Sequence, residues 1–347
     1  MSFSKNFKIA TSLAILILTA WFVYGLISSD KIAKEKKVIG VLRYIAQLEK
    51  VEEGFYLGME ELGYKDGENV TYIVTPYGNS PEKMEGLAQD LLAQNVDLIV
   101  AITNVGATGA KQAIAKSSRP DLPVVFSHAS SPDVTGLVKS FKSSGNNLTG
   151  VAVNFVEVTA KKLEFFRQID PSIKRLGIIE ATHTDPAGAL ILSELKKAAP
   201  RFGMTIVHYK VESNAGAESS AELTLVANSI KEGEMDAFFY IIGPVTNSAE
   251  SVELLANMTK RLRIPSVFHN ADQVGLGGLF AYSPDLIAMG KQTSVFVDKV
   301  LKGQKPSDIP VEPNSKNVLS LNLKTAQEVG MTFPASMLNI AAVKVDK

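Results

Sequence analysis

From Val38 onward, short apolar runs alternate with segments that have the periodicity of an amphipathic helix. The run Leu98–Ile102 is apolar throughout, and the segment before it places Met84, Leu87 and Leu91 on one helix face. Continuous apolar strands are typical of parallel sheets, because helices cover both faces of such sheets and keep them from water. The sequence therefore predicts an α/β fold built from repeated strand–helix units.

The strand–helix pattern occurs in two successive sets. The first covers residues 38–153 and the second covers residues 154–282, followed by a helix near 285–301 and one more strand at Asn317–Leu323. Two sets predict two similar lobes with parallel sheets. Open parallel sheets bind ligands at the carboxyl ends of their strands, so we expect a ligand cleft between the lobes.

The N-terminal segment, residues 1–37, is different in character. Lys5 and Lys8 precede an uncharged run from Ile9 to Ser29. About 20 helical residues cross a hydrocarbon core of about 30 Å, so the run predicts one N-terminal transmembrane helix that anchors the protein in the cytoplasmic membrane through residues 9–29. A removable signal peptide is the alternative interpretation. Both place the remaining chain on the outer face of the cytoplasmic membrane, either anchored or released.

The composition argues against several classes of protein. Residues 1–37 contain six lysines and two acids, and the whole chain has 36 basic and 36 acidic residues, so the body carries a net charge of −4. A mildly acidic body argues against nucleic acid as a partner, because phosphates require a basic face. The chain has no cysteine, which excludes disulfides and cysteine-ligated zinc. Its histidines lack metal-ligand spacing, and we expect no metal and no cofactor.

Polar residues follow most of the predicted strands, at the edge where a ligand between two lobes would lie. The candidate ligand-binding residues in the first lobe are Arg43, Tyr44, Thr103, Asn104, Ser127, His128 and Ser130. Those in the second lobe are Glu180, Thr182, Val245, Thr246, Asn270 and Asp272.

Several of these residues also allow a structural interpretation. Thr103 and Asn104 lead into a helix whose free N–H groups suit a carboxylate or phosphate, but they could equally cap that helix. Arg43 could belong to a salt bridge, and Ser130 could be an ordinary turn residue. A histidine at a strand end, such as His128, could be a supporting group that does not touch the ligand.

Ordered motifs along the body resemble a known family. The matching segments are Gly54-Phe55, Glu61-Leu62-Gly63-Tyr64, Gly67-Glu68-Asn69-Val70, Val96–Ala101 followed by Thr103, Pro123–Phe126, Ser131-Pro132-Asp133, Gly136-Leu137-Val138, Asn147–Val151, Gly290–Thr293, Gly303–Pro306 and Ile309-Pro310. Their order and spacing are similar to those of the ABC-transporter substrate-binding proteins of the tryptophan/tyrosine-binding type. The resemblance covers residues from Val38 to the C-terminus.

The resemblance implies a type I periplasmic-binding-protein fold, in which two Rossmann-like lobes joined by three crossovers close on a ligand by hinge motion. Residues 38–153 and about 283–316 would form the first lobe. Residues 154–282 and about 317–347 would form the second.

The resemblance also implies a ligand class and its contacts. The usual ligands are aromatic or other amino acids. Their carboxylate would be held near the helix that begins at Thr103 and Asn104, and by hydroxyls of the loop that contains Ser127 and Ser130.

This sequence departs from the family pattern in places. The loop after Arg43 is shortened, the lipid-anchor cysteine is missing, and Val245 stands where an ammonium-binding aspartate is expected. An unmatched ammonium in a closed cleft costs several kcal/mol. Either Glu180 or Asp272 takes over this role, or the ligand is not an α-amino acid.

The leading hypothesis is therefore an extracytoplasmic solute-binding protein that delivers a small, amino-acid-like solute to an ABC permease. A ligand-sensing module that signals to a membrane receptor would have the same pocket and is the alternative. An exported enzyme would need a nucleophile paired with a base and an acid. Ser127, His128 and Ser130 form the one candidate cluster, without a recognisable acid partner, so we predict that the protein is not an enzyme.

Overall fold

The computed structural model describes residues 36–181, 186–212 and 217–346. Within these ranges, no helix is both long and apolar enough to cross a bilayer. The membrane segment predicted at residues 9–29 lies outside the described residues.

The first sheet, which defines lobe 1, is parallel throughout. Its strand order is β11-β5-β4-β3-β1-β2. The central strands are buried along their whole length, which explains their continuous apolar sequences. The bounds are β1 (Lys37–Leu42), β2 (Val70–Val74), β3 (Leu98–Ile102), β4 (Val124–Ser130), β5 (Leu148–Val153) and β11 (Glu312–Pro313).

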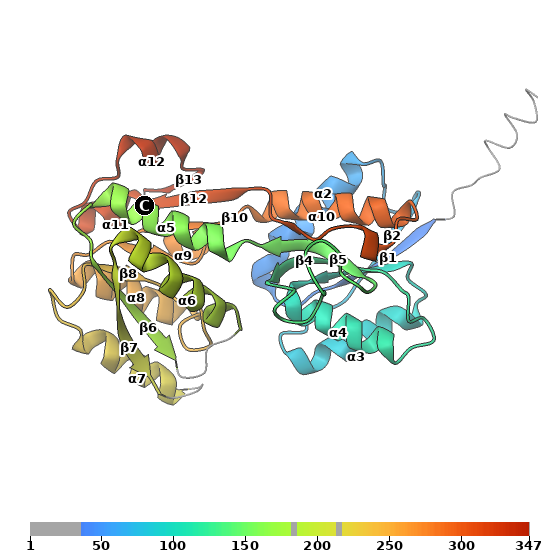
Figure 1. The fold of residues 1–347 in the computed structure, drawn as a ribbon, viewed down its shortest axis with the longest axis horizontal. Helices are drawn as coiled ribbons and strands as arrows, with labels where there is room; N and C mark the ends of the chain where they lie inside the picture. The colour runs from blue at the N-terminus through green and yellow to red at the C-terminus, as the bar shows by residue number, and fades with distance from the viewer. Residues whose placement is uncertain (1–35, 182–185, 213–216, 347) are drawn as a thin grey trace, which may run out of the picture.

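Helices cover both faces of this sheet, as the sequence predicts. One face packs against α3 (Pro81–Ala93) and α4 (Thr103–Ala115), and the other packs against α2 (Glu49–Glu61) and α10 (Leu286–Leu301). Helices α2 and α10 lie side by side in Figure 1. They touch backbone to backbone, because a β-carbon on Gly54 or Gly290 would overlap main-chain atoms of the other helix.

The second sheet, which defines lobe 2, has the strand order β13-β12-β10-β9-β8-β6-β7. Its strands pair in parallel except for β12, which is antiparallel to β10. The prediction of parallel sheets is therefore wrong for β12 and for β13, which pairs in parallel with β12 and so also runs opposite to the other strands. The reason is the path of the chain, since β10 leaves lobe 2 and β12 returns beside it. The bounds are β6 (Arg175–Ala181), β7 (Thr205–Val211), β8 (Ala237–Phe239), β9 (Ser266–Phe268), β10 (Phe280–Pro284), β12 (Asn317–Asn322) and β13 (Val343–Val345).

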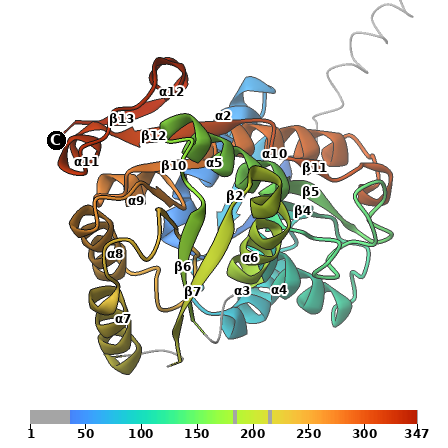
Figure 2. The same ribbon diagram turned by 60° about the vertical axis from the view of Figure 1, so that its left-hand side comes forward.

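Lobe 2 is also layered. Figure 2 shows α6 on one side of β6 and β7 and α7 on the other side. Helices α5 and α6 enclose one apolar cluster with the sheet, and α7 and α8 enclose another. The bounds are α5 (Phe155–Ile169), α6 (Pro186–Ala198), α7 (Ala217–Ser229), α8 (Ala249–Arg261), α9 (Ala271–Gly275), α11 (Leu323–Glu328) and α12 (Ala335–Ile340), with short 3₁₀ turns at Ala46–Leu48, Ala199–Phe202 and Pro306–Asp308.

The chain passes between the sheets after β5, after β10 and after β11, and Figure 1 shows these crossovers running together along one side of the molecule. Polar contacts join them. Asn154 N–H donates to the Asn314 side-chain oxygen at 3.2 Å, and the Asn314 amide donates to the Lys316 carbonyl at 3.0 Å. Lys316 in turn pairs with Asp285 at 2.8 Å. Asn314 and Lys316 therefore tie all three crossovers to one another.

Candidate ligand-binding site between the lobes

A β-bulge at the end of β4 sets the position of His128. Strand β4 pairs with β5 as far as Phe126, opposite Gly150, and pairing resumes at Ala129, opposite Ala152. Two residues of β4 therefore lie opposite one residue of β5. Gly150 has a φ of 150°, and a β-carbon there would overlap the Phe126 carbonyl oxygen. The bulge thus requires a glycine at position 150.

Unusual backbone conformations gather at the carboxyl ends of β3 and β4. Thr103 has a φ of 72°, His128 a φ of 57° and Ser131 a φ of 41°. Non-glycine residues rarely adopt such angles, least of all a β-branched threonine. Observed outliers of this kind cluster at functional sites, where the surrounding structure holds them in place. They mark this end of lobe 1 as a candidate site.

His128 of lobe 1 and Lys162 of lobe 2 both lie close enough to His269 of lobe 2 for their charges to act on it. We call these three residues the interlobe cluster. Burial, together with the charges of Lys162 and His128, lowers the pKa of His269 to about 3. Burial likewise lowers the pKa of His128 to about 4. Both imidazoles are therefore neutral near pH 7, and each offers one N–H donor and one acceptor nitrogen.

Lys162 is the residue of this cluster that the sequence reasoning missed. It lies on the buried face of α5 and is only 3% exposed, and its Nζ atom lies 5.6 Å from the centre of the Phe239 ring. Burial lowers its pKa to about 7. A signal was present in the sequence, because Lys162 follows Val158 by four residues and precedes Phe166 by four, on the apolar face of the helix.

The side chain of Asn104 uses its hydrogen bonds to hold the backbone next to the site. Its side-chain oxygen accepts from the Ser130 N–H at 2.6 Å, and its amide donates to the Ser130 carbonyl at 2.8 Å. It thereby joins the start of α4 to the end of β4. Thr103 accepts from the Gly106 N–H at 3.4 Å, which is a long capping contact.

The other candidates in lobe 1 are held by their own lobe. Ser127 is fully buried, and its hydroxyl bonds to that of Thr293 at 2.8 Å. Arg43 donates to the Thr75 carbonyl at 2.6 Å and stacks on the Tyr77 ring at 4.2 Å. Its guanidinium also lies 3.8 Å from Glu52. Tyr44 packs against the apolar cluster beneath α3 and α4.

Val245 and Thr246 form the interior of a loop in lobe 2. Val245 is 4% exposed and packs in the apolar cluster of α7 and α8. The Thr246 hydroxyl donates to the Ile241 carbonyl at 2.9 Å, and the Tyr240 hydroxyl donates to the Thr246 carbonyl at 2.8 Å. These contacts explain the loop without a ligand.

The remaining candidates in lobe 2 lie in different surroundings. Glu180 approaches His208 of the neighbouring strand at 3.4 Å. Asn270 caps α9 by accepting from the Gln273 N–H at 3.1 Å, and Asp272 is exposed in the first turn of that helix. Thr182 lies outside the described residues.

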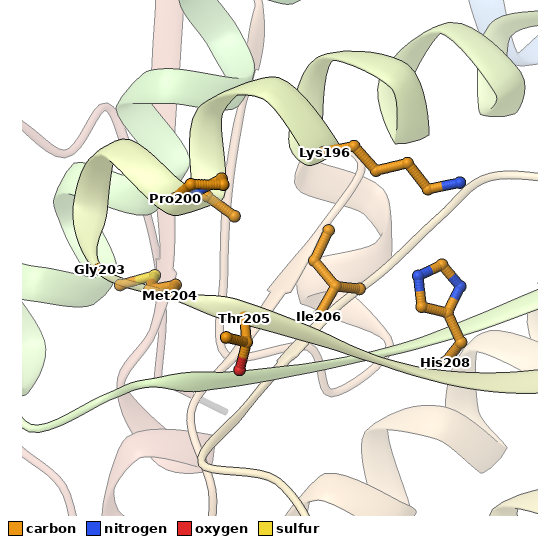
Figure 3. Close-up of a pocket in the computed structure, with 8 residues that line it drawn as sticks. Lys196, Pro200, Gly203, Met204, Thr205, Ile206 and His208 are labelled. Carbon is orange, nitrogen blue, oxygen red and sulfur yellow. The ribbon is translucent and has the colours of Figure 1, made fainter.

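A shallow pocket of about 490 Å³ indents the outer part of lobe 2, beside the edge strand β7. Figure 3 shows Ile206 and His208 projecting from β7 toward α6, where Lys196 extends over them. A more polar hollow next to it contains Glu180 and Lys210. The structure therefore groups Glu180 with His208 at the sheet edge.

The site shows no catalytic arrangement in the part of the chain that the structure describes. There, no hydrogen bond joins Ser130 to His128, and no carboxylate forms an ion pair with His128. The described residues also contain no group of three or more potential metal ligands. The geometry instead offers neutral donors, acceptors and one buried amine to a bound molecule.

Comparison with known proteins identifies the family of this chain. Residues 38–345 match the model of a family described as ABC transporter substrate binding protein. The chain belongs to this family. A "Tyrosine-binding protein" of Clostridioides difficile is 24% identical over 318 residues, which cover 91% of this chain and 87% of that protein. These relatives are solute-binding proteins and not enzymes, and proteins of the family work outside the cytoplasm.

Solved structures of similar proteins share the two-lobed fold of this substrate-binding protein. One is an ABC domain from Streptococcus pneumoniae in complex with L-Trp, with a TM-score of 0.73 and 27% identity. The structural match covers 89% of this chain and 100% of the Streptococcus pneumoniae chain. Another is a ligand-free, open substrate-binding protein from Clostridium difficile, with a TM-score of 0.73, 24% identity and coverage of 89% and 100%. These likenesses confirm the type I periplasmic-binding-protein fold that the sequence motifs predict.

Proposed function

We propose that this protein captures a small organic solute between its lobes and delivers it to an ABC importer in the cytoplasmic membrane. The observation that carries the proposal is the interlobe cluster, in which His269 of lobe 2 lies close enough to His128 of lobe 1 and to Lys162 for their charges to act on it. A group held by both lobes can couple binding to their relative position. The tyrosine and tryptophan in the names of the relatives favour a solute of amino-acid size, aromatic in part.

Closure of the lobes by hinge motion belongs to this proposal. The chain crosses between lobes at three adjacent places, and Asn314 bonds to the backbone of two of them. Such a connection restricts relative motion to bending about one region. We assign residues 38–153 and about 283–316 to lobe 1 and residues 154–282 and about 317–347 to lobe 2.

The proposed contacts come from both lobes. Thr103, His128 and Ser130 lie at the strand ends of lobe 1, and Asn270 follows β9 of lobe 2 beside His269. Arg43, Tyr44 and Asp272 are further candidates at strand or helix ends. An ABC permease is the proposed membrane partner, and residues 9–29 are the proposed anchor at the outer face of the membrane.

Thermal melts test the binding function. The full-length chain, purified in detergent, is stripped of copurified solute by unfolding and refolding. It is then melted with aromatic amino acids, their deaminated acids, nucleosides, polyamines and small carboxylates. A solute at about 100 times its Kd adds about 2.7 kcal/mol of stability, which is about 5–10 °C in Tm for a chain of this size.

Two variants locate the site. Replacement His128→Ala should abolish the shift in Tm, whereas Lys196→Ala, in the outer pocket of lobe 2, should leave it intact. A shift that survives His128→Ala and disappears with Lys196→Ala would move the site to the outer pocket. Uptake of the identified solute by cells that lack this protein should fall, and normal uptake would instead favour the sensing role.

A further inference from the structure

Lys162 is a buried amine whose charge has no protein counterpart among the described residues. No ion pair of Lys162 occurs there, whereas the adjacent Lys161 pairs with Glu164 at 2.8 Å on the outer side of the same helix. A buried ammonium normally requires an anion or several hydrogen bonds, because removal from water is costly. Among the described residues, the contact of the Lys162 Nζ atom is with the Phe239 ring, at 5.6 Å.

The groups that face Lys162 are equally short of negative charge. Phe239 of β8 lies beneath the ammonium, and His269 approaches from the segment after β9. His128 of lobe 1 lies near the same His269. None of these side chains is anionic, and both histidines are neutral near pH 7. The interlobe cluster therefore has one potential positive charge and no negative charge among the described residues.

This arrangement discriminates between solutes by their charge. A carboxylate beside Lys162 would supply the missing counter-charge in a medium of low polarity, where such a pair is strong. An α-ammonium at the same place would meet a like charge and two neutral rings.

We propose that the solute carries a carboxylate and no α-ammonium, and that Lys162 pairs with this carboxylate where the two lobes meet. The chemical class is that of deaminated organic acids, including aromatic propionates and 2-hydroxy or 2-oxo acids. This inference rests on the proposed function and specifies its solute. It adds Lys162 as a residue that determines specificity.

Matched solute pairs test the inference by calorimetric titration of the full-length chain in detergent. The pairs are L-tyrosine with 3-(4-hydroxyphenyl)propionate, L-tryptophan with indole-3-propionate, and L-leucine with 4-methylpentanoate. Members of each pair differ only in the α-ammonium. We expect the deaminated member of at least one pair to bind more than about tenfold more tightly. The reason is that the amino acid must bury an α-ammonium without an anionic partner, and the deaminated acid does not.

Two lysine variants give the control. Lys162→Met should weaken binding of the acid by about 10- to 100-fold, whereas Lys161→Met should leave it unchanged. Tighter binding of the amino acid, or an unchanged Kd for Lys162→Met, overturns the inference and leaves the solute-binding function standing. Absence of binding by every solute, including those of the melting panel, overturns both.

Proton uptake provides a readout that loss of folding cannot imitate. Burial keeps Lys162 mostly neutral above a pKa of about 7, so pairing with a carboxylate at pH 8.5 must draw a proton from the buffer. The uptake, measured from titrations in buffers of different ionisation enthalpy, should approach one proton at pH 8.5 and fall toward zero at pH 6. Binding without uptake at pH 8.5 contradicts the pairing.

Discussion

The backbone of Gly150 lies so close to the carbonyl oxygen of Phe126 that no β-carbon fits between them. This contact allows the bulge in β4 and thereby the position of His128. Position 150 therefore requires a glycine, and this contact gives the physical reason for the glycine in the motif Asn147–Val151.

Replacement Gly150→Ala should destabilise the protein by about 3 kcal/mol and also weaken solute binding, because the strand must move and His128 moves with it. Urea unfolding and titration measure the two effects. Gly86→Ala is the matched control, since the added methyl group meets no atom within 4 Å and the residue lies in helix α3. Normal binding by Gly150→Ala would show that the bulge does not position the site.

Lys162→Met should raise the stability of the solute-free protein even though it weakens binding. The folded pKa of Lys162 is lowered from 10.5 to about 7, so the unfolded state binds more protons between these values. Wild-type stability therefore rises with pH across this window, and the variant lacks that rise. The variant should be more stable by about 1–4 kcal/mol at pH 6, with little difference near pH 10.5. Urea unfolding at both pH values measures this, and equal stability at pH 6 would contradict it.

The two histidines of the interlobe cluster should make the protein sensitive to acid. Their folded pKa values of about 4 for His128 and about 3 for His269 lie below the usual 6.5. The unfolded state therefore takes up protons first, and stability is lost as the pH falls below about 6.5. His269→Gln should reduce the loss between pH 7 and pH 4 by about 1–3 kcal/mol. Urea unfolding across this pH range measures the loss, and an unchanged profile for His269→Gln would contradict the prediction.

Asn314→Ala should weaken the connection between the crossovers. The variant loses its bonds to Asn154 and Lys316, and partly buried backbone groups lose their partners. We expect a loss of about 1–3 kcal/mol in unfolding free energy and faster hydrogen exchange at residues 152–156 and 314–317. Gln89→Ala removes one exposed side-chain contact and should do neither. Unchanged exchange in the crossovers would show that Asn314 does not restrain them.

Apolar periodicity predicted the layered architecture, because buried strands need continuous apolar runs and buried helix faces need apolar residues every three or four positions. The direction of β12 was not predictable in this way, since it depends on where the chain re-enters lobe 2. Lys162 was missed because a helical lysine usually points to solvent, and only its register with Val158 and Phe166 indicates burial. Ser127 and His128 are neighbours within β4, yet the bulge directs the two side chains to different surroundings.

The threefold passage of the chain also has a consequence for proteolysis. A protease that cuts one crossover leaves the lobes joined by two continuous stretches and by the contacts of Lys316 with Asp285. One nick divides the chain into two fragments, but at least one lobe then contains parts of both, and their packing holds them together. The cleaved protein should therefore still migrate as a single species until it is denatured. For a protein that works outside the cytoplasm, this sharing of each lobe between distant parts of the chain is a form of resistance to the surroundings.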